Sequence, residues 1–202
     1  MPKRVDHEER RTQIAEALVR VAAARGLHAV GMRDVAAEAG VSLRLVQYYF
    51  ETKEKLLLYG LQQLVEGFGS RVTARVAATG PDPGPRAVIE ALLLAALPTD
   101  EQSRAFHLLH TSYTLLAVTD ETLAAQPSFD SPRAAEDAVA GLLEKAAGAG
   151  RTAPGTDPRA EAAALLAMSA GLGTSVLAGY RTAESAAGLI RHQLDRIFPA
   201  GG

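Results

Sequence analysis

The chain has 202 residues, of which 48% are hydrophobic and 22% are charged, and its formal net charge at pH 7 is -2. This composition excludes a disordered or fibrous protein, and the length suits one large domain or a small domain joined to a larger one. The lack of cysteine excludes disulfides, thiolate zinc sites and a cysteine nucleophile, and it suits a reducing cytoplasm.

Charge is unevenly distributed along the chain. Residues 1–55 contain ten lysines and arginines and eight acidic residues, giving +2, whereas the remainder contains eleven and fifteen, giving -4. This mild excess of positive charge in the first part gives only weak support to nucleic-acid binding. The sequence Met1-Pro2-Lys3-Arg4 leads into charged residues rather than an apolar signal segment, so we expect a cytoplasmic protein.

Apolar residues recur at helical spacing through most of the chain, and strand signals are scarce. Gly26 and Gly40 are expected to end helices, because glycine readily adopts the backbone conformation that follows a helix. Ser42 and Thr52 are expected to cap helices, because their hydroxyls accept hydrogen bonds from free backbone N–H groups. The helices expected in this part are 7–25, 32–39, 42–49 and 52–78. One face of the first is apolar and predicted to be buried: Ile14, Ala17, Leu18, Val21 and Ala22.

The segment from Gly80 to Pro85, GPDPGP, interrupts the helical pattern and predicts a loop. Beyond it the pattern predicts helices at 86–97, 100–118, 132–147, 158–179 and 183–198. The predicted fold is therefore all-α, with more helices than a four-helix bundle. The stretch from Ala162 to Tyr180 has no charged residue and is about long enough to span a bilayer. Because it is mostly alanine, glycine and serine, we interpret it as a helix buried in a protein core or dimer interface, without a membrane partner.

Two of the short helices meet at the sequence Ala39-Gly40-Val41-Ser42. Gly40 permits a tight turn, and Val41 can fill the space between the two helices. Four flanking side chains fall at spacings that predict an inward orientation: Val35, Ala36, Val46 and Phe50. This arrangement is typical of a helix-turn-helix, in which the second helix enters the major groove of DNA.

The stretch from Arg11 to Leu57 resembles the DNA-binding domain of the TetR family of transcriptional regulators. The matching residues are Ile14, Ala17, Gly26, Arg33-Asp34-Val35-Ala36, Ala39-Gly40-Val41-Ser42, Tyr49-Phe50 and Lys53-Glu54. Leu45-Val46-Gln47 resembles a variant in the branch related to choline-responsive regulators. The resemblance implies a three-helix helix-turn-helix domain, residues 1–52, and a larger helical domain, residues 53–202, for ligand binding and dimerisation.

The resemblance also implies a function. A member of this family is expected to repress transcription as a homodimer on a palindromic operator and to leave the operator when a small, largely apolar effector binds. No cofactor and no metal are expected. Three residues depart from the family's pattern: Gly31 replaces a usual threonine or serine, Arg44 a common glycine, and Gln47 a common tyrosine. These departures mean that an operator sequence cannot be carried over from the family.

The side chains expected to contact DNA lie on or beside the second helix of the motif: Arg33, Ser42, Leu43, Arg44, Gln47, Tyr48, Tyr49 and Lys53. Arg44 suits guanine, because its guanidinium can donate two hydrogen bonds to the base edge, and Gln47 suits adenine, because its amide can donate one and accept one. Lys53 is expected at a helix N-terminus that favours a phosphate. Arg10, Arg11 and Lys55 are further expected contacts to the DNA backbone. The alternative is that Arg33 and Arg44 are ordinary solvated charges.

The larger domain contains aromatic and histidine side chains that suggest a ligand pocket. The residues proposed to line it are Phe68, Phe106, His107, His110, Tyr113, Phe129 and Tyr180. A pocket of this type is mostly apolar with a few polar groups that orient the ligand. The alternative is an ordinary core that contains two histidines with satisfied hydrogen bonds. A metal site at His107 and His110 is disfavoured, because no carboxylate accompanies them at ligand spacing.

The last two predicted helices carry stripes that suggest a dimer interface. Small residues recur four apart at Ala167, Gly171, Ser175 and Gly179, which allows close helix approach. An apolar stripe on the last helix consists of Ala183, Ala187, Ile190, Leu194 and Ile197. Of these we expect Gly171, Ser175, Ile190, Leu194 and Ile197 to lie in the interface. The core of a single chain would explain the same stripes.

The sequence disfavours two other classes of protein. An enzyme is disfavoured, because Gly171-Leu172-Gly173 follows no strand and therefore lacks the context of a phosphate-binding loop. The chain also shows no nucleophile elbow and no paired histidines flanking a glutamate. A ligand-independent architectural DNA-binding protein is disfavoured by the large apolar second part.

Overall fold

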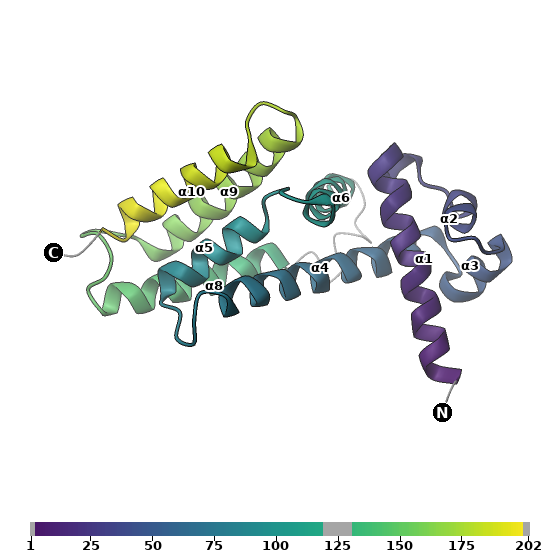
Figure 1. The fold of residues 1–202 in the computed structure, drawn as a ribbon, viewed down its shortest axis with the longest axis horizontal. Helices are drawn as coiled ribbons and strands as arrows, with labels where there is room; N and C mark the ends of the chain where they lie inside the picture. The colour runs from purple at the N-terminus through teal and green to yellow at the C-terminus, as the bar shows by residue number, and fades with distance from the viewer. Residues whose placement is uncertain (1–2, 119–130, 200–202) are drawn as a thin grey trace. The chain divides into compact units, whose positions relative to one another are not determined.

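The computed structural model describes residues 3–118 and 131–199, and every regular element within these ranges is a helix (Figure 1). The prediction of an all-α fold is therefore confirmed. Packing divides the described chain into two units, one of residues 3–67 and 108–118 and the other of residues 68–107 and 131–199. Helices α4 (Lys53–Ala77) and α6 (Glu101–Ala117) each contribute residues to both units.

The first unit is built on α1 (Lys3–Arg25), α2 (Met32–Glu38), α3 (Leu43–Phe50) and the first part of α4. A short 3-10 turn over Leu27–Ala29 follows α1. The apolar face predicted for the first helix is buried, as are the four side chains of the motif predicted to point inward. The side chains predicted from the sequence pattern to be buried therefore form the core of the first unit.

The turn between α2 and α3 has the geometry that its sequence predicts. Gly40 has a φ of 66°, and the N–H of Val41 donates to the carbonyl of Ala36 at 2.9 Å, which closes the end of α2. Ser42 then caps α3, because its Oγ accepts from the N–H of Leu45 at 3.2 Å. These bonds involve neighbours in sequence, so the turn is fixed locally.

The boundary between the packing units differs from the predicted domain boundary at residue 52. The first four turns of α4 pack into the N-terminal unit, where Leu56, Leu57 and Leu61 are buried, and the division falls after Gly67. The cause is that a single long helix continues from one hydrophobic cluster to the next without a break in its backbone.

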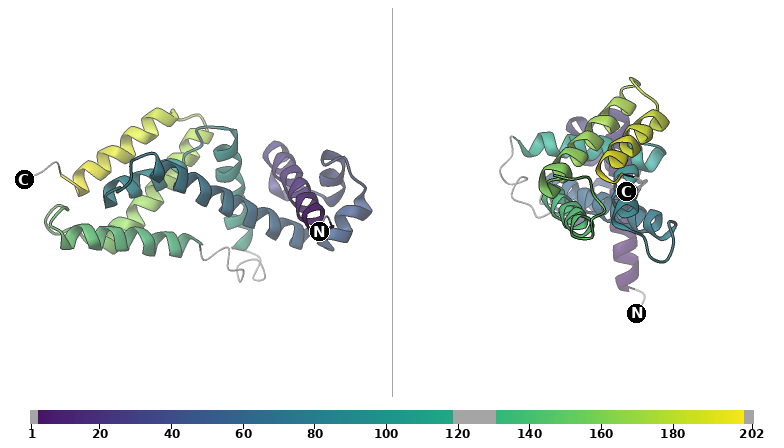
Figure 2. Two further views of the ribbon diagram at one scale, coloured as in Figure 1. Left: turned by 60° about the horizontal axis from the view of Figure 1, so that its bottom comes forward. Right: turned by 90° about the vertical axis from the view of Figure 1, so that its left-hand side faces the viewer.

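The second unit consists mainly of α5 (Pro85–Ala95), α8 (Ser131–Gly148), α9 (Pro158–Leu177) and α10 (Ala183–Ile197). Pro85 occupies the first turn of α5, so that helix begins at the end of the predicted loop. The carboxylate of Asp157 accepts hydrogen bonds at the start of α9, and the hydroxyl of Thr182 does the same at the start of α10. Figure 2 shows α9 and α10 side by side in two further views.

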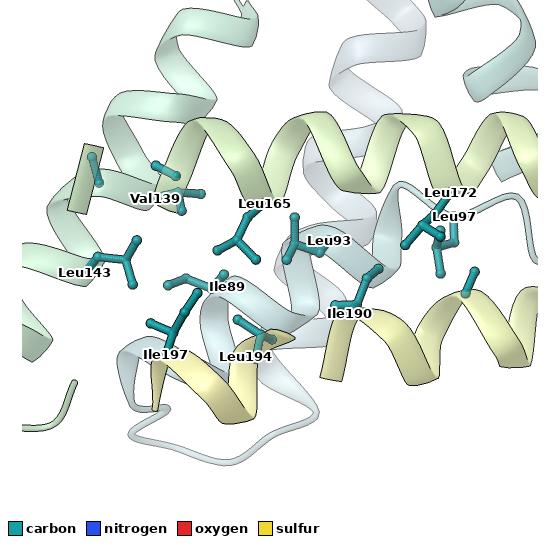
Figure 3. Packing of buried hydrophobic residues seen from close by; sticks show 13 residues of the cluster. Ile89, Leu93, Leu97, Val139, Leu143, Leu165, Leu172, Ile190, Leu194 and Ile197 are labelled. Atoms are coloured by element: carbon teal, nitrogen blue, oxygen red, sulfur yellow. The ribbon is translucent and has the colours of Figure 1, made fainter. Parts of the chain in front are cut away.

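The core of the second unit lies between α5, α8, α9 and α10, whose apolar side chains point toward one another in Figure 3. Ile190, Leu194 and Ile197 belong to this core and have almost no exposed surface in the single chain. The prediction that these three side chains form the dimer interface is therefore wrong. The stripe on α10 is apolar because it faces α5 and α9 of its own chain.

Helix α9 has an opposite, exposed face that consists of small residues. These residues are Ala160, Ala163, Ala164, Ala167, Ala170, Gly171, Thr174 and Ala178. By length and composition α9 is the one described helix that is apolar enough to cross a membrane, yet only 28% of that window is buried inside the chain. Gly171 is exposed and Ser175 is half-buried, so both remain available to a partner. Unlike the core stripe, this small-residue face of α9 lacks a covering element among the described residues.

Candidate functional site

The predicted recognition helix α3 has one buried and one exposed face. Val46 and Phe50 are buried in the first unit, whereas Arg44, Gln47 and Tyr48 are exposed. Tyr48 keeps 69% of its surface accessible, so its ring and hydroxyl are available to a partner. The exposed face thus combines a guanidinium, an amide and a phenol, the groups that contact base edges and phosphates.

The remaining predicted DNA contacts surround this face. Arg33 is exposed on α2, Leu43 and Tyr49 are half-buried on α3, and Lys53 is half-buried in the first turn of α4. Ser42 is exposed, and because its Oγ accepts the capping hydrogen bond, its hydroxyl proton can still be donated. The structure therefore agrees in exposure with the set proposed from the sequence.

The structure adds His7 to this region, which the sequence analysis missed. The centroid of the His7 ring lies 5.5 Å from that of Tyr49 and 6.4 Å from that of Tyr48, and the two tyrosine rings are 5.3 Å apart. His7 is exposed at the beginning of α1, about forty positions away in sequence. No local pattern indicates this cluster, because it depends on how α1 crosses α3.

Two of the other predicted backbone contacts have partners within the chain. The guanidinium of Arg11 lies over the ring of Tyr59, 4.5 Å from its centroid, and over the ring of Phe50 at 5.5 Å. The Nζ of Lys55 forms an ion pair with Glu51 at 2.6 Å. Arg11 therefore stabilises the packing of α1 on α4, and its role as a contact to the DNA backbone stays a prediction.

The departure at Gly31 has a visible consequence. No side chain at this position caps α2, and only the carboxylate of Asp34 reaches back, accepting from the N–H of Gly31 at 3.1 Å. Asp34 also accepts from Arg25 at 3.1 Å. The helix start therefore depends on Asp34, and the hydroxyl available to a phosphate in the family pattern is lost.

In the second unit the predicted ligand-contacting residues Phe68 and Phe106 come together. Their rings stack with centroids 4.7 Å apart and planes inclined by 5°. Phe68 is half-buried on α4 and Phe106 is buried on α6. The two phenyl rings bring the two helices together and form an aromatic platform within this unit.

The other predicted ligand-contacting residues are placed differently. Tyr180 keeps 86% of its surface exposed beyond the end of α9, so its assignment to a pocket is wrong. Tyr113 is buried in the first unit, where its hydroxyl donates to the carbonyl of Leu57, and burial raises its pKa. His110 is half-buried and also belongs to the first unit. Phe129 lies outside the described residues.

His107 fits the alternative reading, a core histidine with satisfied hydrogen bonds. Its Nε2 lies 3.3 Å from Oγ1 of Thr174, and it also bonds to the backbone of Ala96. Burial lowers the pKa of His107, and the bond to Ala96 opposes this shift. The ring also lies directly against Gly173, where a Cβ atom would overlap the imidazole. The lowered pKa favours the neutral imidazole, and His107 joins α6 to α9.

This contact gives a stability prediction. Gly173→Ala should lower the free energy of unfolding by about 1–3 kcal/mol, because the added methyl group forces the buried imidazole to move. Gly141→Ala is the matched control, since Gly141 is an exposed helical glycine with open space around its Cβ position. There alanine should stabilise the helix by up to about 1 kcal/mol. Thermal unfolding followed by circular dichroism measures both, and equal stability of the two variants would contradict the packing argument.

Comparison with known proteins agrees with these features. The family model described as bacterial regulatory proteins, tetR family, matches residues 14–59. The model described as BetI-type transcriptional repressor, C-terminal, matches residues 85–199. Together these matches cover the helix-turn-helix and most of the second unit.

Two curated relatives are the HTH-type transcriptional regulators PksA of Bacillus subtilis and BetI of Agrobacterium fabrum. PksA is 38% identical over 104 residues, which are 51% of this chain and 49% of PksA. BetI is 30% identical over 129 residues, which are 64% of this chain and 53% of that protein. The chain thus spans about half the length of the curated relatives it matches. Both are described as regulators, which agrees with the prediction that this chain is not an enzyme.

Solved structures show the same fold. One from Rhodococcus sp., described as a TetR-family transcriptional regulator, has 25% identity and a TM-score of 0.78 over 95% of this chain and 99% of its own. Another, described as a transcriptional regulator from Saccharomonospora viridis in complex with choline, has 23% identity and a TM-score of 0.82 over 96% and 100%. The similarity to the structure from Saccharomonospora viridis shows a shared fold and nothing further.

Proposed function

Because the chain belongs to the TetR family of bacterial regulatory proteins, we propose that it is a cytoplasmic transcriptional repressor that binds a palindromic operator as a homodimer and is released by a small-molecule effector. The observation that carries this proposal is the exposed face of α3, with Arg44, Gln47 and Tyr48 opposite buried Val46 and Phe50. In a helix-turn-helix this face enters the major groove.

Dimerisation is supported by the small-residue face of α9. Seven exposed, uncharged positions on α9, with Ala178 directly after the helix, are unusual for a solvated surface, and small side chains allow a second helix to approach closely. Leu189 on the neighbouring α10 adds a large hydrophobic side chain that is 39% exposed. A two-fold axis through this surface would pair α9 and α10 with their copies in a four-helix arrangement.

The two-fold symmetry of the proposed dimer also predicts the arrangement of the operator. A two-fold dimer presents two copies of α3, so we expect two half-sites related by a palindrome, with centres roughly 34–36 Å apart or a little more. A gel-shift assay against a selected palindrome and a random duplex tests this expectation. Equal affinity for both duplexes would contradict the proposal of a sequence-specific regulator.

Base recognition can be tested at Arg44. Arg44→Ala should weaken operator binding by about 1–3 kcal/mol and relax the preference at one base pair in each half-site. Arg133→Ala, which removes an exposed arginine of α8, is the matched control and should leave affinity unchanged. Fluorescence anisotropy with operator and random DNA measures the difference. If Arg44→Ala weakens both duplexes equally, Arg44 contacts phosphate rather than a base.

Effector release is supported by the two-unit construction. Helix α4 begins beside the recognition helix at Lys53 and continues into the second unit, where Phe68 joins the aromatic pair. An effector that favours one position of α4 would change the separation of the two recognition helices. Because such coupling is reciprocal, operator DNA should weaken effector binding by the same factor, about 5–150-fold.

A further inference from the structure

The aromatic pair in the second unit already has a cation on it. The guanidinium carbon of Arg71 lies 5.3 Å from the ring centroid of Phe106 and 5.8 Å from that of Phe68. All three residues belong to the second unit, with Phe68 and Arg71 one turn apart on α4 and Phe106 on α6. The arginine therefore belongs to the same surface as the two stacked rings.

The Nε–Nη2 edge of this guanidinium has no hydrogen-bond partner among the described residues. Its Nε and Nη2 atoms are both buried, and neither has a hydrogen-bond acceptor among the described residues. An aromatic ring attracts the positive charge but offers no lone pair to N–H groups that lie in the guanidinium plane. Buried donors without acceptors are costly and rare in proteins, and a ligand is one of the groups that completes them.

The carboxylate of Asp100, which acts on Arg71 through its charge, accepts hydrogen bonds from other residues. Asp100, whose charge acts on Arg71, accepts from the N–H of Ser103 at 2.7 Å at the start of α6, and its second oxygen lies 3.5 Å from Thr99 Oγ1. No ion pair joins Asp100 and Arg71 among the described contacts. Arg75, the next cation on α4, adds a second positive charge to the surroundings of Arg71. Among the described residues Arg71 thus feels the charge of Asp100 but forms no ion pair with it.

We propose that the effector is a carboxylate with an apolar body, held by the Nε–Nη2 edge of Arg71 and by the rings of Phe68 and Phe106. The two N–H groups on that edge are parallel, and they match the two oxygens of a carboxylate, which can accept both bonds at once. The apolar body then lies against the aromatic pair. A quaternary ammonium compound such as choline is disfavoured at this place, because the positive charge of Arg71 beside the rings repels another cation. This inference rests on the proposed function, since it gives the chemical class of the effector.

The charge of the ligand provides a test that needs no variant. Isothermal titration and thermal shift of the full-length protein should show binding of benzoate or octanoate at millimolar concentrations. Benzamide, a neutral isostere of benzoate, should bind at least about tenfold more weakly, because it forms no charge-assisted pair. Choline should produce no shift. Equal binding of benzoate and benzamide, binding of choline, or no binding by any carboxylate from acetate to decanoate at 10 mM would overturn the proposal.

Variants of Arg71 locate the site. Arg71→Gln should weaken carboxylate binding about tenfold or more and abolish the difference in affinity between benzoate and benzamide. Arg71→Lys should retain part of that difference, because lysine keeps the positive charge but lacks the two parallel N–H groups of the guanidinium. Arg133→Gln, which removes an exposed arginine of α8, is the matched control and should bind benzoate as the parent does. Should Arg71→Gln fail to fold, Arg71→Lys and the ligand comparison still decide the question.

An operator titration separates this inference from the proposed function. Carboxylate binding that depends on Arg71 but leaves operator affinity unchanged would uphold the site and contradict effector release. Sequence-specific operator binding without any carboxylate response would uphold the DNA-binding role and overturn the site.

Discussion

Leu194→Glu should unfold the second unit rather than separate two folded subunits. Leu194 has no exposed surface in the single chain and packs in the core with Ile89 and Ile190 (Figure 3). A carboxylate at this position would have neither water nor a cation beside it. Burying its charge costs free energy, and so does protonating it, and the apolar contacts of the leucine are lost in addition. The expected loss is about 4–5 kcal/mol, a large fraction of the total stability of a typical domain.

Circular dichroism and denaturant unfolding measure this effect. Leu194→Met, which conserves volume and apolarity, is the control and should lose less than about 1.5 kcal/mol. A Leu194→Glu protein with the helical signal and unfolding midpoint of the parent would show that Leu194 lies at an interface between chains instead of in the core.

Ala167→Glu should have the complementary effect, keeping the fold but abolishing the dimer. Ala167 lies in the small-residue face of α9, where glutamate is solvated in the single chain and clashes only when a second copy covers it. Charges on both subunits of a symmetric interface also repel one another, because each faces the same surface of its partner. The monomer should bind operator at least about two orders of magnitude more weakly, because the two recognition helices no longer act as one bivalent unit.

Light scattering and anisotropy on the same sample test both parts of this prediction. Ala138→Glu adds the same charge at an exposed alanine of α8 and should leave the dimer and operator affinity unchanged. An Ala167→Glu protein that remains dimeric at micromolar concentration would refute the α9 interface. A parent chain that is itself monomeric under these conditions would refute dimerisation.

The helix-turn-helix could be predicted from sequence almost residue by residue. The positive φ of Gly40, the cap by Ser42 and the inward face at Val46 and Phe50 all depend on bonds and spacings within a few positions. Local hydrogen bonds of this kind form wherever the residue types and their order allow them. The same reasoning gave the ends of most helices to within one or two residues.

The candidate sites were predicted less completely. Exposure of Arg44 and Gln47 follows from helical periodicity, but the cluster of His7 with Tyr48 and Tyr49 joins segments far apart in sequence. Arg71 carried no signal in the sequence, since an arginine on a long polar helix is normally solvated. The tertiary structure buries its Nε and Nη2 and places its guanidinium over the ring of Phe106 on α6, which makes Arg71 a candidate anion-binding group.

The sequence by itself determined that the chain is all-helical, where its helices begin and end, and which motif meets DNA. The tertiary structure alone decided which apolar surface is core and which is left uncovered. Periodicity shows that one face of a helix avoids water, but it does not show which element covers that face. Thus Ile190 and Leu194 proved to face α5 and α9 of their own chain, whereas Ala167 and Gly171, equally free of charge, remain exposed.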